Sequence, residues 1–470
     1  MSDNYDKLVT DLLIIGGGPG GYIAAIYGAK HGLNVTLVEK DTLGGTCLNV
    51  GCIPTKALVK SAEVCQTIRN SEEFGVICEG DLNVDMEKVI NRKDEVKDRL
   101  VGGVEFLMKK NKIQVLKGEA SFLSNKSVIV NGDRSTNIEF KDVIIATGSR
   151  ISKINIPGIG LPFVMNSTEA LSSTELPSSI TIVGGGVIGM EFAFIYRNLG
   201  VEVNVIEYMD RLLTMVDKDV SREIKKACRK AGIVVVNNAK VLRIESNDKG
   251  LANVIYEDKK GEQTVESEKV LIAIGREPNM ENLAIENTDV LLNDNGRGIA
   301  VNEQMKTNIE HIYGIGDVTN IIQLAHVASH QGIVAVDNIL GKQRTIDYKA
   351  IPNVIFTSPE IATVGLTEEQ CIEQELDYTV SKVSYLSNGK ALTMRQTEGF
   401  IKLIKDNTNS KILGCSIIGA DASSLISTLT LAISSGLTEV DLRDTIFPHP
   451  TTSEVIQEVV FGLGIGSLSS

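Results

Sequence analysis

Short apolar runs separated by glycine-rich turns organise the first half of this chain. Leu12–Ile15 and Val35–Val38 are two such runs, and a glycine turn followed by a helix-length segment lies between them. The same order returns at Ile180–Val183 and Val203–Ile206. Short apolar runs bounded by turns are typical of buried strands. The pattern therefore predicts two copies of a strand–turn–helix–strand unit and an α/β fold.

Each turn carries three glycines in G-x-G-x-x-G spacing, and an acidic residue follows the first glycine by 23 positions. These residues are Gly16, Gly18, Gly21 and Glu39 in the first copy, and Gly184, Gly186, Gly189 and Glu207 in the second. The glycines allow a tight turn, close approach to a pyrophosphate and helix packing, while the carboxylate accepts ribose hydroxyls. The alternative is that both glycine turns are structural and bind no ligand. This interpretation is weaker, because the whole fingerprint, the three glycines together with the later acidic residue, occurs twice. We expect two dinucleotides, with Glu207 favouring NAD over NADP and the nearby Arg211 weakening that preference.

Composition narrows the class of protein. The chain is 43% hydrophobic and 23% charged, as in an ordinary globular protein, and its 470 residues predict roughly three domains. No apolar run reaches the ~18–20 residues of a membrane span, and a net charge of −13 disfavours nucleic acid and anionic membranes as partners. The N-terminus lacks a secretory pattern, and seven scattered cysteines form no structural disulfide framework. These features favour the cytoplasm.

Two of the cysteines, Cys47 and Cys52, follow the first glycine turn with four residues between them. In a regular helix their Cα atoms would lie roughly 8–9 Å apart, whereas a disulfide needs about 4.4–6.8 Å. A disulfide therefore requires a distorted turn, for which Gly51 supplies backbone freedom, and Pro54 suits the first turn of a helix that follows. Taken alone, the pair is equally compatible with two reduced cysteines in a loop. Beside a dinucleotide site it favours electron exchange with a flavin, so we expect FAD at the first site and NAD at the second.

The segment Gly44–Leu58, which holds both cysteines, resembles the redox-active segment of the flavoprotein disulfide reductases (class I pyridine nucleotide-disulfide oxidoreductases), most closely that of the dihydrolipoamide dehydrogenases. The resemblance extends along nearly the whole chain. The other segments that carry it are Val143–Ser149, Ile312–Asp317, Gln323–His326, Ile351–Glu360 and Phe447–Glu454.

This resemblance implies an α/β fold with two Rossmann-like domains, for FAD and NAD, and a C-terminal α+β dimerisation domain. The expected boundaries are 1–150 for the FAD domain with its redox-active cysteines, 151–280 for the NAD domain, 281–350 for a central segment that completes the FAD site, and 351–470 for the dimerisation domain.

By the same resemblance, Cys47 is the thiol that exchanges with substrate, and Cys52 is the sulfur that faces the flavin. Lys56 follows Cys52 by one helical turn, and is expected to pair with Glu191 near the flavin, where its charge would stabilise the reduced ring. Further expected contacts to FAD or NAD are Gly118, Thr147, Gly148, Ser149, Gly275, Asp317 and Ala325.

His449 has proline on both sides and Glu454 five residues later. The resemblance makes His449 the catalytic base, with Glu454 fixing its tautomer, and we expect a cis peptide at His449–Pro450. Dihydrolipoamide dehydrogenases often carry a second histidine two positions before the catalytic one, where this chain has Phe447. In the family the base serves the cysteines of the other subunit, so the resemblance implies a homodimer. The other histidines have no metal-ligand spacing, and we expect no metal.

The implied function is oxidation of protein-bound dihydrolipoamide to lipoamide through a Cys47–Cys52 disulfide and FAD, with reduction of NAD. The lipoyl group is expected on a partner protein of a 2-oxo acid dehydrogenase-type or glycine cleavage complex, because the first glycine loop begins at residue 16.

A glutathione or mercuric reductase is the alternative within the family. The residues Glu207–Asp210 include none of the arginines typical of NADP sites, and no cysteine pair follows Cys415. A redox-sensing module without turnover is the alternative from another class, and the His449–Glu454 pair argues against it.

Overall fold

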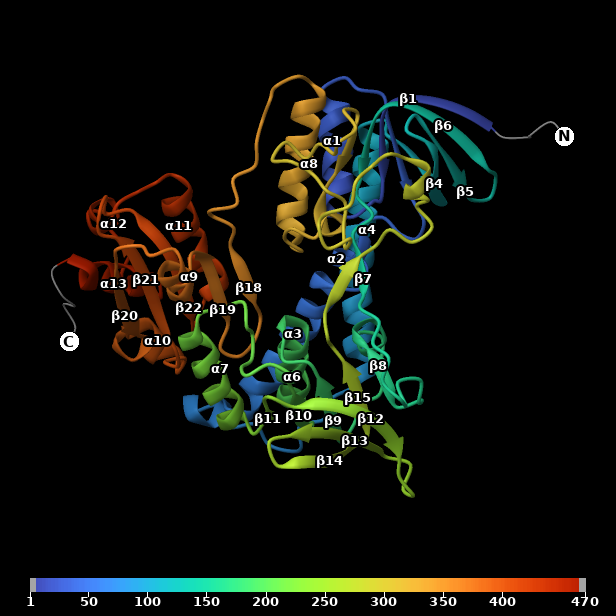
Figure 1. The fold of residues 1–470 in the computed structure, drawn as a ribbon. Helices are drawn as coiled ribbons and strands as arrows, with labels where there is room; N and C mark the ends of the chain where they lie inside the picture. Colours follow the sequence, from blue (N-terminus) through green and yellow to red (C-terminus); the bar gives the residue numbers. More distant parts are fainter. Residues whose placement is uncertain (1–5, 465–470) are drawn as a thin grey trace.

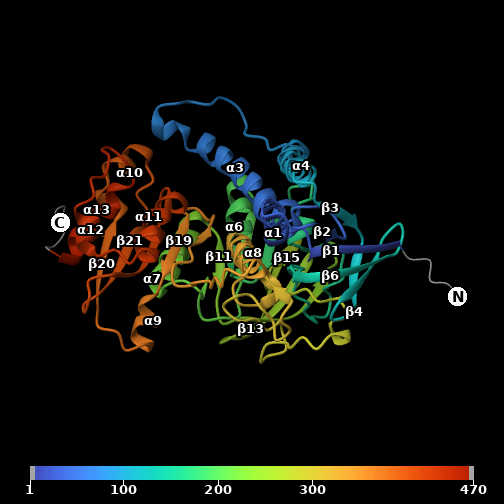
Figure 2. The same cartoon turned by 90° about the horizontal axis from the view of Figure 1, so that it is seen from above.

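The computed structural model describes residues 6–464, which form three units (Figure 1). The first unit lies at the top of Figure 1, the second below it and the third, in orange and red, beside both. Seen from above, α3 (Cys52–Arg69) extends from the first unit across the second towards the third (Figure 2). Because α3 packs against α6 (Val187–Leu199), the helix that begins at Cys52 joins the two predicted nucleotide sites.

The first unit is built on a sheet whose central strands are parallel, as the apolar pattern predicts. Leu12 pairs with Val35 and Ile15 with Val38, so both strands end at one edge of the sheet, where Rossmann folds bind ligands. In spatial order the strands are β3 (Gln114–Lys117), β2 (Val35–Glu39), β1 (Asp6–Ile15), β6 (Thr136–Ile145), β5 (Ser127–Asn131) and β4 (Glu119–Ser124), and β17 (Ile312–Gly314) pairs with β6. β1 begins six residues before the run Leu12–Ile15, because its first half pairs with β6.

The helices of the first unit lie beside this sheet or, in the case of α3, extend from it to α6. They are α1 (Pro19–Lys30), α2 (Gly45–Asn49), α3, α4 (Met86–Lys110) and α8 (Ala325–Ile339), with 3-10 turns at Ser71–Phe74, Ile285–Asn287 and Gly316–Thr319. α1 and α8 pack against each other although about 300 residues separate them. The segment that contains β17 and α8 therefore completes the first unit from far along the chain.

The second unit repeats the arrangement in a fully parallel five-stranded sheet. Its strands, in order, are β11 (Val234–Val236), β10 (Glu202–Ile206), β9 (Ser179–Val183), β15 (Lys269–Ile272) and β8 (Val164–Asn166). The helices are α5 (Ser167–Ala170), α6 and α7 (Lys218–Ala231), and β12 (Lys240–Ser246), β13 (Ala252–Asp258) and β14 (Gly261–Ser267) form a separate antiparallel sheet. A short ribbon of β7 (Ser149–Ile151) and β16 (Arg276–Pro278) joins this unit to the first.

The third unit is a five-stranded antiparallel sheet with helices, so the expected α+β architecture is present. Its strands are β18 (Asn353–Ile355), β19 (Ile361–Gly365), β22 (Ile412–Ile418), β21 (Phe400–Asp406) and β20 (Tyr378–Ser384). Its helices are α9 (Glu368–Glu373), α10 (Gly389–Met394), α11 (Ala422–Ser434), α12 (Glu439–Arg443) and α13 (Glu454–Gly464), with a 3-10 turn at Tyr385–Ser387. Over residues 6–464, every helix is too short or too polar to cross a membrane.

Candidate active site

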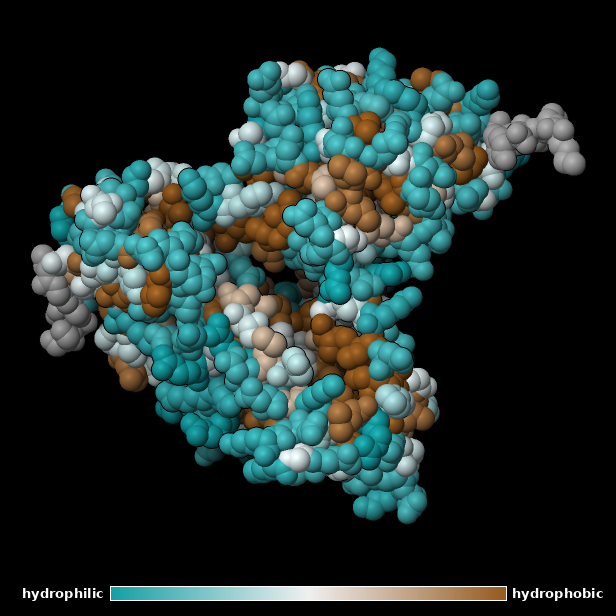
Figure 3. All heavy atoms as spheres, viewed as in Figure 1, coloured by the Kyte–Doolittle hydropathy of each residue, from teal (hydrophilic) through white to brown (hydrophobic). Residues whose placement is uncertain are grey.

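One large cavity connects the two glycine turns with the cysteine pair. It measures about 1890 Å³, more than the ~300–1,000 Å³ of an ordinary small-molecule pocket. Figure 3 shows the hollow between the units, with apolar side chains on its walls. The expected site residues that line it are Gly16, Gly18, Glu39, Cys47, Cys52, Lys56, Gly118, Thr147, Gly148, Ser149, Gly184, Gly186, Glu191, Glu207, Gly275, Asp317 and Ala325.

Gly21 and Gly189 are not among the lining residues, because they face the strand–helix packing. A Cβ on Gly21 would lie 1.8 Å from the carbonyl oxygen of Gly16, and one on Gly189 would lie 2.0 Å from that of Gly184. The first glycines also have positive φ, +108° at Gly16 and +112° at Gly184, which L side chains rarely adopt. Each turn therefore has the close helix–strand contact that the third glycine of the fingerprint permits.

The middle glycines, Gly18 and Gly186, have free space where a side chain would start. A Cβ on Gly186 would meet nothing within 4 Å, and one on Gly18 would only reach ordinary contact distance from Gly45. Each glycine is also the N-cap of a long helix, α1 or α6, without a side-chain cap. Open space at the positive end of a helix dipole suits a pyrophosphate. Both turns therefore fit the dinucleotides that the sequence predicts.

Glu39 and Glu207 are held in the same way at the ends of β2 and β10. One carboxylate oxygen accepts the backbone N–H of the glycine turn, at 2.7 Å from Gly17 and 2.5 Å from Gly185. The other oxygen accepts the N–H two residues after the glutamate, at 2.8 Å for Glu39 and 2.6 Å for Glu207. A carboxylate oxygen can accept more than one hydrogen bond. Each glutamate is thus fixed at the cavity wall with acceptor capacity left for ribose hydroxyls.

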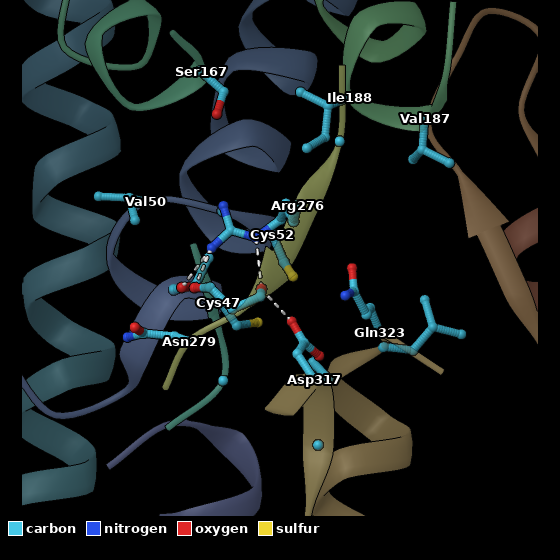
Figure 4. A pocket seen from close by; sticks show the side chains of 18 of the residues that line it. Cys47, Val50, Cys52, Ser167, Val187, Ile188, Arg276, Asn279, Asp317 and Gln323 are labelled. Atoms are coloured by element: carbon cyan, nitrogen blue, oxygen red, sulfur yellow. Dashed lines mark hydrogen bonds between the residues drawn. The ribbon is translucent and has the colours of Figure 1, made fainter. Parts of the chain in front are cut away.

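A chain of polar contacts crosses the cavity wall near the cysteines (Figure 4). Ser149 Oγ donates to Asp317 Oδ2 at 2.5 Å, and Arg276 Nε donates to Ser149 Oγ at 2.8 Å. Arg276 Nη2 also donates to Thr46 Oγ1 at 3.2 Å, next to Cys47. Burial raises the pKa of Asp317 and lowers that of Arg276, because both charged groups are shielded from water at this part of the cavity wall. The side chains of Arg276 and Thr46 are site residues that the sequence analysis missed, because it expected only the neighbouring Gly275 to contact a cofactor.

The cysteine segment is a break between two helices, as the disulfide geometry required. Cys47 lies in α2, which ends at Asn49, and Cys52 is the first residue of α3. A Cβ on Gly51 would lie 2.8 Å from the carbonyl oxygen of Thr46, so the turn needs glycine. Both cysteines are unbridged here, and the interaction between their side chains has the largest effect on the pKa of each.

The two thiols have opposite acidities. The hydrogen bond from Cys47 lowers the pKa of Cys52 to about 7, aided by the positive charge of Lys56, although burial opposes it. The same hydrogen bond and burial raise the pKa of Cys47. At the start of α3 the helix dipole also favours the anion. A single negative charge on the pair therefore resides on Cys52 near neutral pH.

Lys56 forms an ion pair with Glu191 from α6. Its Nζ lies 2.9 Å and 3.0 Å from the two carboxylate oxygens. Phe356, which follows β18 in the third unit, donates its backbone N–H to Glu191 at 3.0 Å, and its ring centre lies 4.5 Å from the Lys56 ammonium. All three units thus meet beside the cysteines. The contribution of Phe356 could not be read from the sequence, because no local pattern marks it.

His449 and Glu454 are paired with each other but are not among the residues that line the cavity. His449 Nδ1 lies 2.8 Å from Glu454 Oε1, and Oε2 accepts the Thr451 N–H at 2.9 Å. These hydrogen bonds lower the pKa of Glu454. The His449 side chain is 78% exposed, and the His449–Pro450 peptide is cis, as expected. Phe447, where a second histidine was considered, is partly buried and packs against the core of the third unit.

Comparison with known proteins agrees with this geometry. Residues 10–332 match the family model described as pyridine nucleotide-disulphide oxidoreductase, and residues 351–460 match the dimerisation domain of that family. A dihydrolipoyl dehydrogenase of Bacillus subtilis is 43% identical over 462 residues, covering 95% of this chain and 96% of that protein. One from Geobacillus stearothermophilus is 40% identical over 451 residues, covering 96% and 95%. The HOCl-induced flavoprotein disulfide reductase RclA from Escherichia coli has a TM-score of 0.86 and 31% identity, covering 96% of this chain and 99% of that structure.

Proposed function

This chain belongs to the pyridine nucleotide-disulphide oxidoreductase family, and on that premise we propose that its reaction is the oxidation of protein-bound dihydrolipoamide by NAD. The family is one of FAD-dependent oxidoreductases that work through a redox-active cysteine pair. The observation that carries the proposal is the single cavity in which Cys47, Cys52 and the Lys56–Glu191 pair lie between two dinucleotide turns. Full-length similarity to dihydrolipoyl dehydrogenases supports the choice of substrate.

The cysteines carry the thiol chemistry. In the oxidised enzyme a substrate thiolate attacks Cys47 Sγ, the Cys47–Cys52 bond breaks, and its electron pair leaves on Cys52 as a thiolate. The second substrate thiolate then attacks the mixed disulfide, which forms the lipoamide ring and releases Cys47. The lowered pKa of Cys52 makes it the better leaving sulfur, and Lys56 stabilises its charge. FAD would be held at the first glycine turn by Gly16, Gly18 and Glu39, where it would supply an acceptor for the electron pair of the dithiol.

The base for the substrate thiols is His449 of a second subunit. Glu454 holds Nδ1, so Nε2 is left to accept the proton of the substrate thiol. Because His449 is exposed and belongs to the dimerisation domain, a homodimer in which it faces the partner's cysteines supplies the missing group. We propose that the lipoyl group comes from a partner protein of a 2-oxo acid dehydrogenase-type or glycine cleavage complex.

The nicotinamide cofactor at the second turn is NAD. Glu207 keeps its carboxylate at the ribose position through two backbone N–H groups, and a 2′-phosphate there would be repelled by the negative charge.

A direct assay tests the reaction. The purified, FAD-loaded protein should reduce NAD when given dihydrolipoamide, and the Cys47→Ser variant should not. The same preparation should be inactive with glutathione disulfide or Hg(II) and NADPH, which are the substrates of related reductases. Activity with one of those pairs and none with dihydrolipoamide would contradict the proposal.

The intersubunit base is tested with hybrid dimers. Cys47→Ser and His449→Gln variants should each be inactive alone. After the subunits are mixed and reassociated at random, half of the dimers are hybrids with one complete site, so about a quarter of wild-type activity should return. If base and cysteines belonged to one chain, the hybrids would remain inactive.

A further inference from the structure

Phe356 reaches the redox centre from outside both nucleotide-binding units. We propose that its ring is a positioning element, which holds the Lys56 ammonium beside the Cys52 sulfur and so helps to keep that sulfur anionic. The inference rests on the proposed function only in taking Cys52 as the thiolate of the working pair. It adds to that function a residue of the dimerisation domain that acts through Lys56.

The geometry around Lys56 fixes its ammonium from two sides. Glu191 provides two carboxylate oxygens at 2.9 Å and 3.0 Å, and the face of the Phe356 ring lies 4.5 Å from Nζ. The Phe356 backbone N–H also donates to Glu191 Oε1 at 3.0 Å. A cation within about 6 Å of an aromatic centroid is attracted by the ring quadrupole. Phe356 therefore binds both members of the ion pair, one through its ring and one through its backbone.

The charge on Cys52 depends on where Lys56 stands. The groups that act on this sulfur are the Cys47 thiol, the Lys56 ammonium, the Glu191 carboxylate and the Arg276 guanidinium. Lys56 favours the thiolate and Glu191 disfavours it. Because Coulomb attraction falls with distance, a lysine released from the ring and free to move away would stabilise the thiolate less. Loss of the ring quadrupole should therefore raise the pKa of Cys52.

The ring's electrostatic role can be separated from its packing. Replacing Phe356 by phenylalanines with one, two or three ring fluorines weakens the quadrupole stepwise while the shape is nearly kept, so folding is not at risk. Phe356→Leu removes the ring, and Phe356→Tyr retains it. A matched control exists at Phe400, whose ring lies 3.9 Å from the Lys382 ammonium. Phe400→Leu removes a cation–π contact and buried aromatic surface from the same domain without touching Lys56.

The readout is the pKa of Cys52 in FAD-loaded dimers that also carry Cys47→Ser, so that one sulfur of the pair titrates. It is measured by the pH dependence of the long-wavelength thiolate–flavin absorbance, and independently by the rate of iodoacetamide alkylation at Cys52. We expect the pKa to rise with each added fluorine, by roughly half a unit over the series, as for a contact of this strength. Phe356→Leu should give at least this rise, and Phe356→Tyr and Phe400→Leu should leave the pKa where it is.

Two results would overturn the inference. A pKa that stays constant across the fluorinated series would show that ring charge does not hold Lys56, even if Phe356→Leu shifts it through packing. An equal shift in Phe400→Leu would show a general effect of destabilising the domain. Neither readout uses dihydrolipoamide, so a different substrate would contradict the proposed function and leave this result intact.

Discussion

Replacing Lys402 by methionine should loosen the contact between the NAD-binding unit and the dimerisation domain. Lys402, on β21, is 2% exposed, and its Nζ lies 2.9 Å from Asp217 Oδ1 and 2.6 Å from Glu368 Oε2. Asp217 is the N-cap residue of α7 in the second unit and is 1% exposed. It also accepts the hydroxyl of Ser416 at 2.6 Å. These four residues are here called the Lys402 cluster, in which Lys402 and Asp217 are buried. A third carboxylate, that of Asp219, lies 3.7 Å from Lys402 Nζ.

The size of the expected loss in free energy of unfolding follows from the burial of Asp217. Methionine fills much of the same volume but leaves Asp217 charged, buried and without a cation. Removing one partner of a buried ion pair costs about 3–5 kcal/mol, which is roughly a 150- to 5,000-fold change in the unfolding equilibrium at 1.36 kcal/mol per tenfold. The Glu368 side chain is 37% exposed, so water screens its charge once the lysine is removed. Most of the loss in free energy of unfolding therefore comes from Asp217.

Urea unfolding followed by far-UV circular dichroism and by flavin fluorescence, at fixed protein and FAD concentrations, measures the change. The double variant Lys402→Met with Asp217→Asn is the control. It leaves no uncompensated charge, and we expect it to recover at least half of the loss. The difference between wild type and Lys402→Met should also be constant between about pH 6 and pH 9.

The pKa of Lys402 determines how the stability that this residue contributes depends on pH. Burial opposes the charge of Lys402, but the hydrogen bonds to Glu368 and Asp217 outweigh it and raise its pKa above 10.5. A raised folded-state pKa gives stability that is fully present below the unfolded pKa and is lost only as pH rises through the folded one. A Lys402→Met variant within 1 kcal/mol of wild type would refute the reasoning, as would a double variant less stable than the single one.

Three further predictions concern the cavity. Gly21→Ala should abolish FAD binding in the purified protein, because its Cβ would overlap the Gly16 carbonyl; a normal flavin spectrum would contradict this. Glu207→Ala should raise KM for NAD about tenfold, as expected for loss of hydrogen bonds worth roughly 1.4 kcal/mol, with little change in kcat; an unchanged KM would argue against ribose binding there. Lys56→Met should move the titration of the Cys52 thiolate to higher pH than about 7, because an anion loses its neighbouring cation; a shift to lower pH would reverse the assigned sign.

The nucleotide-binding turns show what local sequence predicts well. Gly21 had to be glycine because of a contact within its own strand–turn–helix unit, five residues from Gly16. Glu39 is held by the N–H of Gly17, in the same unit. Such contacts join residues of one strand–turn–helix unit, so the spacing of these residues along the chain is enough to predict them. The β1 boundary was less accurate, because its first half is stabilised by pairing with β6, far away in sequence.

The cysteine segment lies between these cases. The distance that a disulfide allows required a break near Gly51, and the break is there. The unequal acidities of the two thiols could not be obtained in this way, because they depend on the contact between the two side chains, on burial and on the charge of Lys56. Lys56 is in turn paired with Glu191, 135 residues away. The partnership of those two side chains came from family resemblance and not from any periodicity.

By itself, then, the sequence determined two dinucleotide turns, a redox-active cysteine pair and the family. Each of these features can be recognised from short motifs, whose residues lie close together along the chain. Only the tertiary structure decided that Phe356 and Arg276 lie beside the redox centre, that Lys402 joins two units, and that His449 lies away from the cavity. These placements depend on how separately folded units pack. That packing is the sum of many weak contacts between distant residues, for which no local spacing exists.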